Sequence, residues 1–330
     1  MRAVRLVDVL VPWIVLVGAC SSFDSSPPTA VDANPSDAGV SDAGTGGPDA
    51  AVDDAGVRCD RNAPFTSHRP IDGVNTPEAE AYARVSPDER VIYFQRSFAT
   101  DGRVELYRAS RASKTEAFGT PVLLAGLPTG ARQPFVTADE LEILFVLKLG
   151  DPSSPFTLMH ARRNAVTEPF GDAAPYPITE DPNGIVPDRQ TPSISADGSE
   201  LFFASPSQGN NIDLYRAIRT EDGNFGIPEP LDTLNASTTD NVPVLSPDRL
   251  SLYFYSERNL GADKGTIMVA HRDTPTGPFR APVRVEELTF PGYFSIPGSV
   301  SADNCRLYFS SNKEAEATSY DLYVAERSPP

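Results

Sequence analysis

The residues best suited to chemistry lie just before a recurring turn, and they differ from one copy of that turn to the next. Two of them, Glu80 and Asp240, are carboxylates, and a pair of carboxylates placed across a glycosidic bond can hydrolyse it. The others suit a polar ligand such as a sugar or a peptide. They are also compatible with a water-filled channel mouth in which the charges neutralise one another. The full set is Glu80, Tyr82, Arg132, Gln133, Arg189, Gln190, Asp240 and Asn241.

Other catalytic signatures are not found in the sequence. There is no Gly-x-Ser-x-Gly segment of the kind that carries a nucleophilic serine. His68, His160 and His271 lie on separate predicted strands at unrelated repeat positions, so we expect no zinc site and no other metal or cofactor. A formal charge of −17 leaves no basic face to displace counterions, so we expect no nucleic-acid partner.

The elements that position these residues form a repeat of about 50 residues. Each copy has a turn such as Val85-Ser86-Pro87-Asp88, then a β-rich segment such as Ile92-Tyr93-Phe94. A second β-rich segment follows, with an arginine two residues after its alanine. Short strands joined by turns predict four-stranded antiparallel sheets, the blades of a propeller. The turn aspartates are Asp88, Asp139, Asp197, Asp248 and Asp303, and the arginines are Arg111, Arg163, Arg219, Arg272 and Arg327.

Both recurring charges are predicted to be structural. An aspartate in this position caps a tight turn with its side chain. The arginines are expected to pair, each within its own blade, with acids that precede the second strand of the hairpin, such as Glu105, Asp213 and Asp321. A ligand site is instead expected among the residues that break the repeat.

The number of blades follows from the fourth strand, which begins with phenylalanine at Phe118, Phe170, Phe225 and Phe279. The fifth copy reaches the C-terminus without such a strand, and a matching segment, residues 65–71, precedes the first copy. Pairing the two ends removes an open sheet edge. The sequence therefore predicts an all-β, five-bladed propeller of four-stranded antiparallel blades over residues 58–330, closed by an N-terminal strand that completes the last blade.

Residues 1–19 are typical of a signal peptide, with Arg2 and Arg5 before an apolar stretch too short to span a bilayer. The segment Leu16-Val17-Gly18-Ala19-Cys20 resembles the lipobox of bacterial lipoproteins, in which the cysteine is diacylated. The resemblance implies a lipidated Cys20. Because Ser21 follows in place of aspartate, it also implies the outer membrane of a Gram-negative cell, with the domain periplasmic or surface-exposed. An ordinary signal peptide cut near Ala19 is the alternative.

Residues 20–57 begin with this cysteine and continue with small and acidic residues, so they are predicted to form a disordered tether. Two further cysteines follow it. Cys59 precedes the closing strand, and Cys305 lies in the hairpin of the blade which that strand completes. An exported protein meets an oxidising compartment, so a Cys59–Cys305 disulfide is expected, with two free thiols as the alternative.

The five turns resemble the TolB-like, or WD-like, β-propeller repeat of bacterial envelope and secreted proteins. That resemblance implies the fold but not the activity, because propellers serve as binding platforms, scaffolds and enzymes. We expect a monomeric envelope lipoprotein whose non-catalytic propeller is a binding or scaffold platform for a protein, peptide or glycan. Its contact with the membrane would be through the lipid alone. The alternative is a glycan-active hydrolase of the five-bladed type, with carboxylates at the channel mouth.

Overall fold

The computed structural model describes residues 50–52, 58–151, 153–180, 188–207, 211–258, 264–314 and 319–328. These residues belong to one compact unit, Ala50–Pro330. The predicted signal peptide, Cys20 and most of the predicted tether lie outside the described residues. No helix in the described ranges is long and apolar enough to cross a membrane.

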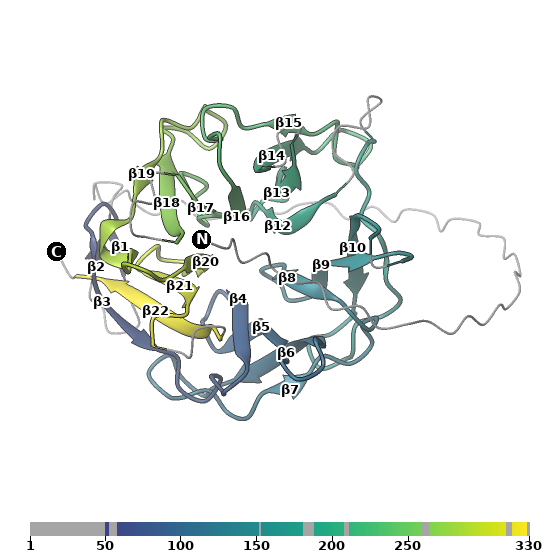
Figure 1. The fold of residues 1–330 in the computed structure, drawn as a ribbon, viewed down its shortest axis with the longest axis horizontal. Coiled ribbons are helices and arrows are strands. Elements are labelled where there is room, and N and C mark those ends of the chain that lie inside the picture. Colours follow the sequence, from purple (N-terminus) through teal and green to yellow (C-terminus); the bar gives the residue numbers. More distant parts are fainter. Residues whose placement is uncertain are drawn as a thin grey trace, which may run out of the picture. The chain divides into compact units, whose positions relative to one another are not determined.

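Five four-stranded antiparallel sheets form a ring, so the predicted architecture is confirmed (Figure 1). The first strand of each repeat copy is innermost, and the later strands follow outward. Blade 1 contains β4 (Ala79–Val85), β5 (Val91–Ser97), β6 (Val104–Ser110) and β7 (Val122–Leu123), and blade 2 contains β8 (Arg132–Val136), β9 (Glu142–Lys148), β10 (Phe156–Arg162) and β11 (Ala174–Pro175). Blade 3 contains β12 (Gln190–Ile194), β13 (Glu200–Pro206), β14 (Ile212–Ile218) and β15 (Glu229–Pro230). Blade 4 contains β16 (Asp240–Leu245), β17 (Ser251–Ser256), β18 (Thr266–His271) and β19 (Val283–Arg284).

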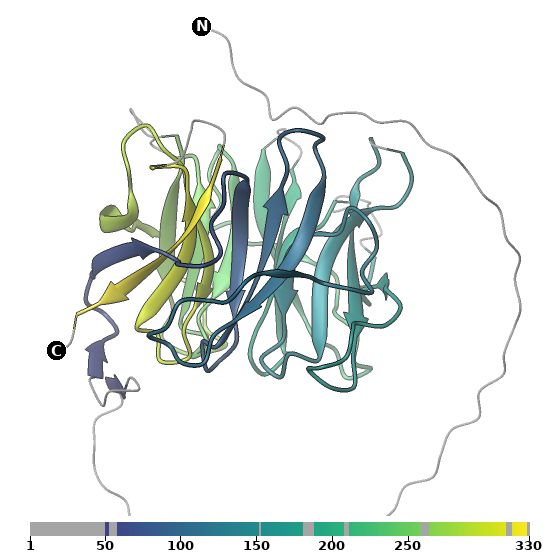
Figure 2. The same ribbon diagram turned by 90° about the horizontal axis from the view of Figure 1, so that it is seen from below.

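The fifth blade is completed by a strand from the other end of the domain. β3 (Phe65–Pro70) pairs with the C-terminal strand β22 (Asp321–Arg327), outside β21 (Arg306–Ser311) and the inner strand β20 (Ser295–Val300). Figure 2 shows β3 and β22 side by side. The closure predicted from the phenylalanine-led strands is therefore confirmed.

A short ribbon and a disulfide secure the same blade. β1 (Ala50–Val52) pairs with β2 (Arg58–Asp60) in a two-stranded sheet. Cys59 of β2 forms the predicted disulfide with Cys305, and both residues are buried. The covalent bond thus joins the segment before the closing strand to the blade which that strand completes.

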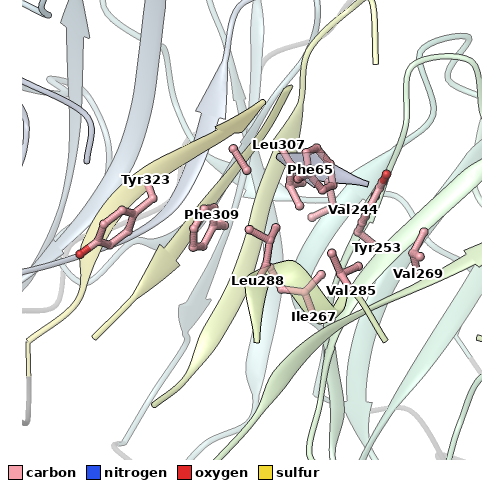
Figure 3. Packing of buried hydrophobic residues seen from close by; sticks show 11 residues of the cluster. Phe65, Val244, Tyr253, Ile267, Val269, Val285, Leu288, Leu307, Phe309 and Tyr323 are labelled. Carbon is pink, nitrogen blue, oxygen red and sulfur yellow. The ribbon is translucent and has the colours of Figure 1, made fainter. Parts of the chain in front are cut away.

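Apolar layers between neighbouring sheets hold the blades together. Because side chains alternate across a strand, one face of each sheet packs on the preceding blade and the other face on the next. Between blades 4 and 5, Tyr253, Ile267 and Phe309 are buried together with Phe65 of β3 (Figure 3). The 3-10 helix Glu286–Leu288 adds to the same cluster. The closing strand therefore supplies a core side chain as well as backbone hydrogen bonds.

The recurring aspartates cap their turns, as predicted. The carboxylate of Asp88 accepts hydrogen bonds from the Ser86 hydroxyl at 2.6 Å and from the Arg90 N–H at 3.0 Å. The other four turn aspartates repeat this arrangement with their own turn residues. Each carboxylate is therefore engaged in shaping its own turn.

The recurring arginines differ from the prediction, because they contact phenylalanine and the preceding blade instead of the proposed acids. Each guanidinium lies 4.2–4.5 Å from the ring of the phenylalanine expected to begin its own fourth strand. Only Phe65 does begin its strand, because the fourth strands of blades 1 to 4 start about four residues after the phenylalanine, at Val122, Ala174, Glu229 and Val283. Each also donates to a side chain of the preceding blade, as Arg163 does to the Tyr93 hydroxyl at 2.8 Å. The acid Glu105 pairs with Arg103. The arginines thus connect neighbouring blades.

Candidate functional site

Glu80 lies near the start of the inner strand β4, and its side chain is fully buried. Its carboxylate accepts hydrogen bonds from the Thr76 N–H at 3.0 Å and from the Thr76 hydroxyl at 2.6 Å, and it pairs with Arg96 at 2.7 Å. Burial raises the pKa of Glu80, while the bonds from Thr76 and Arg96 oppose that rise. The carboxylate therefore holds the loop that enters blade 1.

Asp240 occupies the equivalent position in blade 4 and is also fully buried. It accepts a hydrogen bond from the Ala236 N–H at 2.7 Å and pairs with Arg258 at 2.7 Å. The entry loops of blades 1 and 4 are thus built in the same way. Both candidate acids are shielded from solvent and paired with arginine, which is an arrangement suited to loop anchoring.

A chain of hydrogen bonds connects blades 1 to 4 at the bulges of their inner strands. Each inner strand has a bulge. The Gln133 N–H donates to Gln95 Oε1 at 2.9 Å, and the Thr191 N–H donates to Gln133 Oε1 at 3.0 Å. The Thr191 hydroxyl donates to Asn241 Oδ1 at 2.9 Å. Gln133 and Asn241, both proposed as ligand contacts, therefore link adjacent blades.

The bulge places side chains in a costly backbone conformation. In blades 1 to 4 the bulged residue has φ between +50° and +59°, a region that residues other than glycine rarely adopt. Two of these residues, Thr191 and Val242, are β-branched, for which the conformation is most strained. The hydrogen bonds to Gln133 and Thr191 offset part of this strain. The bulged residues are Tyr82, Gln133, Thr191 and Val242.

The remaining predicted residues each have their own surroundings. Arg189 is largely buried and pairs with Glu180 at 3.0 Å. Arg132 lies 5.2 Å from the ring of Phe156. Gln190 begins β12 and is half-buried. The structure therefore distributes the predicted set among several local contacts near the start of the inner strands, and it does not gather them around one point.

Aromatic side chains that the sequence reasoning missed lie at this end of the channel. Phe294 is 6.5 Å from the ring of Tyr255 and 6.2 Å from that of Tyr320. Burial and the nearby phenol of Tyr82 raise the pKa of Tyr320. These residues occupy different positions in their repeat copies, so no pattern in the sequence connects them. Grouped aromatic rings of this kind suit stacking against a sugar or a peptide side chain.

A cavity of about 620 Å³ lies at the opposite end of the same strands. All five blades line it with the last residues of their inner strands and the turns that follow: residues 84–87, 135–139, 193–198, 244–247 and 298–300. Its lining begins two residues after Tyr82 and Gln133 and three after Gln190, roughly 7–10 Å along the strands, so the cavity borders the predicted channel mouth. Its volume falls in the range of small-molecule sites.

Most of the exposed area of the cavity wall is apolar, and its polar part comprises hydroxyl groups, the carboxylates of Asp139, Glu142 and Asp197, and two arginines, Arg219 and Arg84, of which Arg84 lies on an inner strand. Arg84 stands four residues before the turn aspartate, where the other blades have Phe135, Ser193, Val244 and Ser299. Sequence reasoning passed over Arg84 because it adjoins the repeated turn. The sequence could have revealed Arg84, because it is the one charged residue among the five that stand four residues before a turn aspartate.

The ring of sheets and its channel define a five-bladed β-propeller with a cavity at one end of the channel. The sequence matches no protein-family model and no curated protein. Among solved structures, the fold is similar to that of the RS223 β-xylosidase, with a TM-score of 0.51 at 14% identity, covering 79% of this chain and 94% of the other. The GH43_1 enzyme from Xanthomonas citri, complexed with xylotriose, gives 0.50 at 13% identity, covering 78% and 89%.

TolB from Acinetobacter baumannii is a more distant similarity, with a TM-score of 0.44 at 12% identity. The match covers 76% of this chain, which spans 55% of that protein. At identities this low, the comparisons describe the fold alone.

Proposed function

We propose that this chain is an envelope lipoprotein whose propeller binds a ligand without transforming it. The observation that carries the proposal is the cavity of about 620 Å³ that all five blades line. Both candidate catalytic carboxylates, by contrast, are buried and paired with arginine. A preformed apolar cavity with few polar groups is the usual form of a ligand site.

The binding role can be tested by native mass spectrometry of the full chain released from its own membranes in mild detergent. We expect a bound small molecule, seen as excess mass over the bare lipoprotein. Ser193→Phe would fill the cavity and remove that mass, while Ala112→Phe, on an exposed loop, would keep it. The absence of excess mass, with no thermal stabilisation by any member of a metabolite panel, would contradict the proposal.

The proposed anchor rests on the lipobox-like segment that ends at Cys20. Cys20→Ala is expected to move the protein from the membrane fraction to the soluble fraction. Ser22→Ala serves as the matched control and is expected to remain with the membranes. A Cys20→Ala protein that still sediments with the membranes would refute the anchor.

The hydrolase alternative can be tested on the same protein with polysaccharides and chromogenic glycosides. We expect no turnover, because neither Glu80 nor Asp240 is accessible to a substrate. Turnover that disappears in Glu80→Gln or Asp240→Asn, in variants shown by circular dichroism to remain folded, would overturn the non-catalytic assignment.

A further inference from the structure

Arg84 is a buried cation without a matched partner. The residue is 5% exposed, and within the described part of the chain its Nε and Nη1 atoms have no hydrogen-bond acceptor. The nearest aromatic ring is that of Phe135, with its centroid 5.8 Å from the guanidinium carbon. Burial lowers the pKa of Arg84 to about 10, and the nearby Tyr82 opposes that change only in part. A guanidinium in such surroundings is costly to the folded protein.

Other buried arginines of the propeller show how this charge is normally satisfied. Arg272 donates to Glu200 Oε1 at 2.9 Å and to the Arg249 carbonyl at 2.7 Å. Arg163 donates to the Tyr93 hydroxyl at 2.8 Å. Arg84 differs because both Nε and Nη1 are enclosed without an acceptor among the described residues, while the residue itself borders the cavity.

Backbone amides of the inner strands also point toward the channel at this level. In blade 2 the Thr137 N–H bonds to the Glu142 carbonyl of the second strand, so the preceding N–H, that of Val136, is directed to the other side. The same ladder directs the amides of Ile194 and Val300 toward the channel. These groups are donors, and donors suit an anion.

Two serine hydroxyls complete the donor set. Ser299 Oγ accepts the Val85 N–H at 3.2 Å, and Ser193 Oγ accepts the Leu245 N–H at 3.4 Å. Each hydroxyl oxygen is therefore used as an acceptor, which leaves its hydrogen to be donated. Both serines line the cavity.

The acids in the cavity wall already have partners. Asp139 is bonded to Thr137, and Glu142 is bonded to His160. Asp197 is bonded to Ser195 and, like the others, lies on the side of blades 2 and 3. The rest of the wall is largely apolar, so it favours a ligand with a hydrocarbon body over a fully hydrated ion.

We propose that the cavity binds the carboxylate of a small molecule or chain end with an apolar body, and that Arg84 is its counter-ion. This proposal rests on the binding role proposed above and names the chemical class of the ligand. The shared chemistry is a carboxylate beside hydrocarbon. It can come from a free organic acid or from the C-terminus of a peptide.

The test uses hexanoate, the neutral hexanol, and a hydrophobic tripeptide in free-acid and amidated forms, with calorimetric titration and thermal unfolding of the full chain. We expect hexanoate or the free-acid tripeptide to bind and to raise the melting temperature. The neutral counterpart of the acid that binds, hexanol or the amidated tripeptide, should have little effect. Binding of hexanoate would identify a free organic acid as the ligand, and binding of the free-acid tripeptide would identify a peptide C-terminus. Arg84→Met should weaken that binding roughly 10- to 100-fold, while Arg69→Met, on the exposed face of β3, should not.

Stability of the ligand-free protein gives a second readout that a merely structural arginine would not produce. Removing an uncompensated buried charge should raise the melting temperature of Arg84→Met by about 2–4 °C. A lower melting temperature that Arg84→Lys restores would assign Arg84 to the fold and overturn the proposal. Equal binding of hexanol and hexanoate would also overturn it, while leaving the binding role of the cavity intact. No binding of any probe, with unchanged stability in Arg84→Met, would again reject the carboxylate assignment.

Discussion

Arg327 and Phe65 join the two ends of the propeller, with the guanidinium carbon 4.2 Å from the centroid of the ring. Phe65 begins β3 and Arg327 ends β22. The same contact forms inside blade 1 between Arg111 and Phe118, at 4.3 Å. The closing blade is therefore built from the same parts as the others, although its fourth strand comes from the opposite end of the domain.

This relationship predicts that Phe65 is as important to stability as its counterparts in the other blades. Phe65 is buried between blades 4 and 5, so Phe65→Ala is expected to lower the free energy of unfolding by about 3–5 kcal/mol. Phe118→Ala should have a similar effect. Val122→Ala, at an exposed position of β7, should change it by less than about 0.5 kcal/mol. Urea unfolding of the three variants makes the comparison, and a Phe65→Ala protein as stable as Val122→Ala would show that the seam is not closed by this strand.

The Cys59–Cys305 disulfide should stabilise the same seam. It closes a long loop, for which the chain-entropy treatment gives a contribution of about 5 kcal/mol, reduced by any strain in the folded state. Cys305→Ala should therefore unfold at lower urea than the oxidised parent protein. Adding a reductant should bring the parent to the stability of the variant and leave the variant unchanged. A parent protein indifferent to reductant would contradict this role.

Much of the fold was predictable because each blade repeats the same local chemistry. The turn of Asp88 depends on neighbouring residues, so an aromatic residue such as Phe94 follows the turn aspartate by six residues in every copy. The partners of the arginines were not predictable in that way. Arg163 bonds to Tyr93 of the preceding blade, and nothing in the local sequence of either residue specifies the other.

The candidate site was harder to predict because it depends on how five strands converge. Residues that break the repeat were expected to meet a ligand, and two of them, Glu80 and Asp240, are bonded to the entry loops of their blades. Arg84 also breaks the repeat, but it borders the turn and so reads as part of the strand. Only the ring arrangement shows that Arg84 borders a cavity. It also shows that Nε and Nη1 of Arg84 have no hydrogen-bond acceptor among the described residues.

Asp197 predicts acid lability at the turn of blade 3. Burial alone would raise its pKa, but hydrogen bonds from Ser195 and Ser199 and the charge of Arg249 lower it to about 2. The pKa of an aspartate in the unfolded chain is about 3.9. The stability that Asp197 contributes is therefore complete above about pH 5 and is lost as the pH falls toward 2.

The measurement for Asp197 is the free energy of unfolding between pH 7 and pH 2.5 for the parent and for Asp197→Asn. The difference between the two should be constant above about pH 5 and should shrink below about pH 4. A difference that does not depend on pH would mean that the charge of Asp197 contributes nothing in the folded state.

The ion pair of Glu80 and Arg96 predicts a structural effect where the sequence alone suggested catalysis. Glu80 is fully buried, and the side chain of Arg96 is 12% exposed. Glu80→Gln would leave that cation buried without its counter-charge, which is expected to lower the free energy of unfolding by about 3–5 kcal/mol. Glu105→Gln serves as the control and should change stability little, since its partner Arg103 is far more exposed.

A double variant separates the loss of the ion pair from the loss of the glutamate itself. If the unpaired cation is the cause, Glu80→Gln combined with Arg96→Met should recover a substantial part of the stability lost in Glu80→Gln alone, because no uncompensated charge remains. If the two losses simply add, the carboxylate acts through its bonds to the Thr76 N–H and hydroxyl, and Arg96 is a separate contact. In either case Glu80 contributes to the entry loop of blade 1, where its carboxylate is buried.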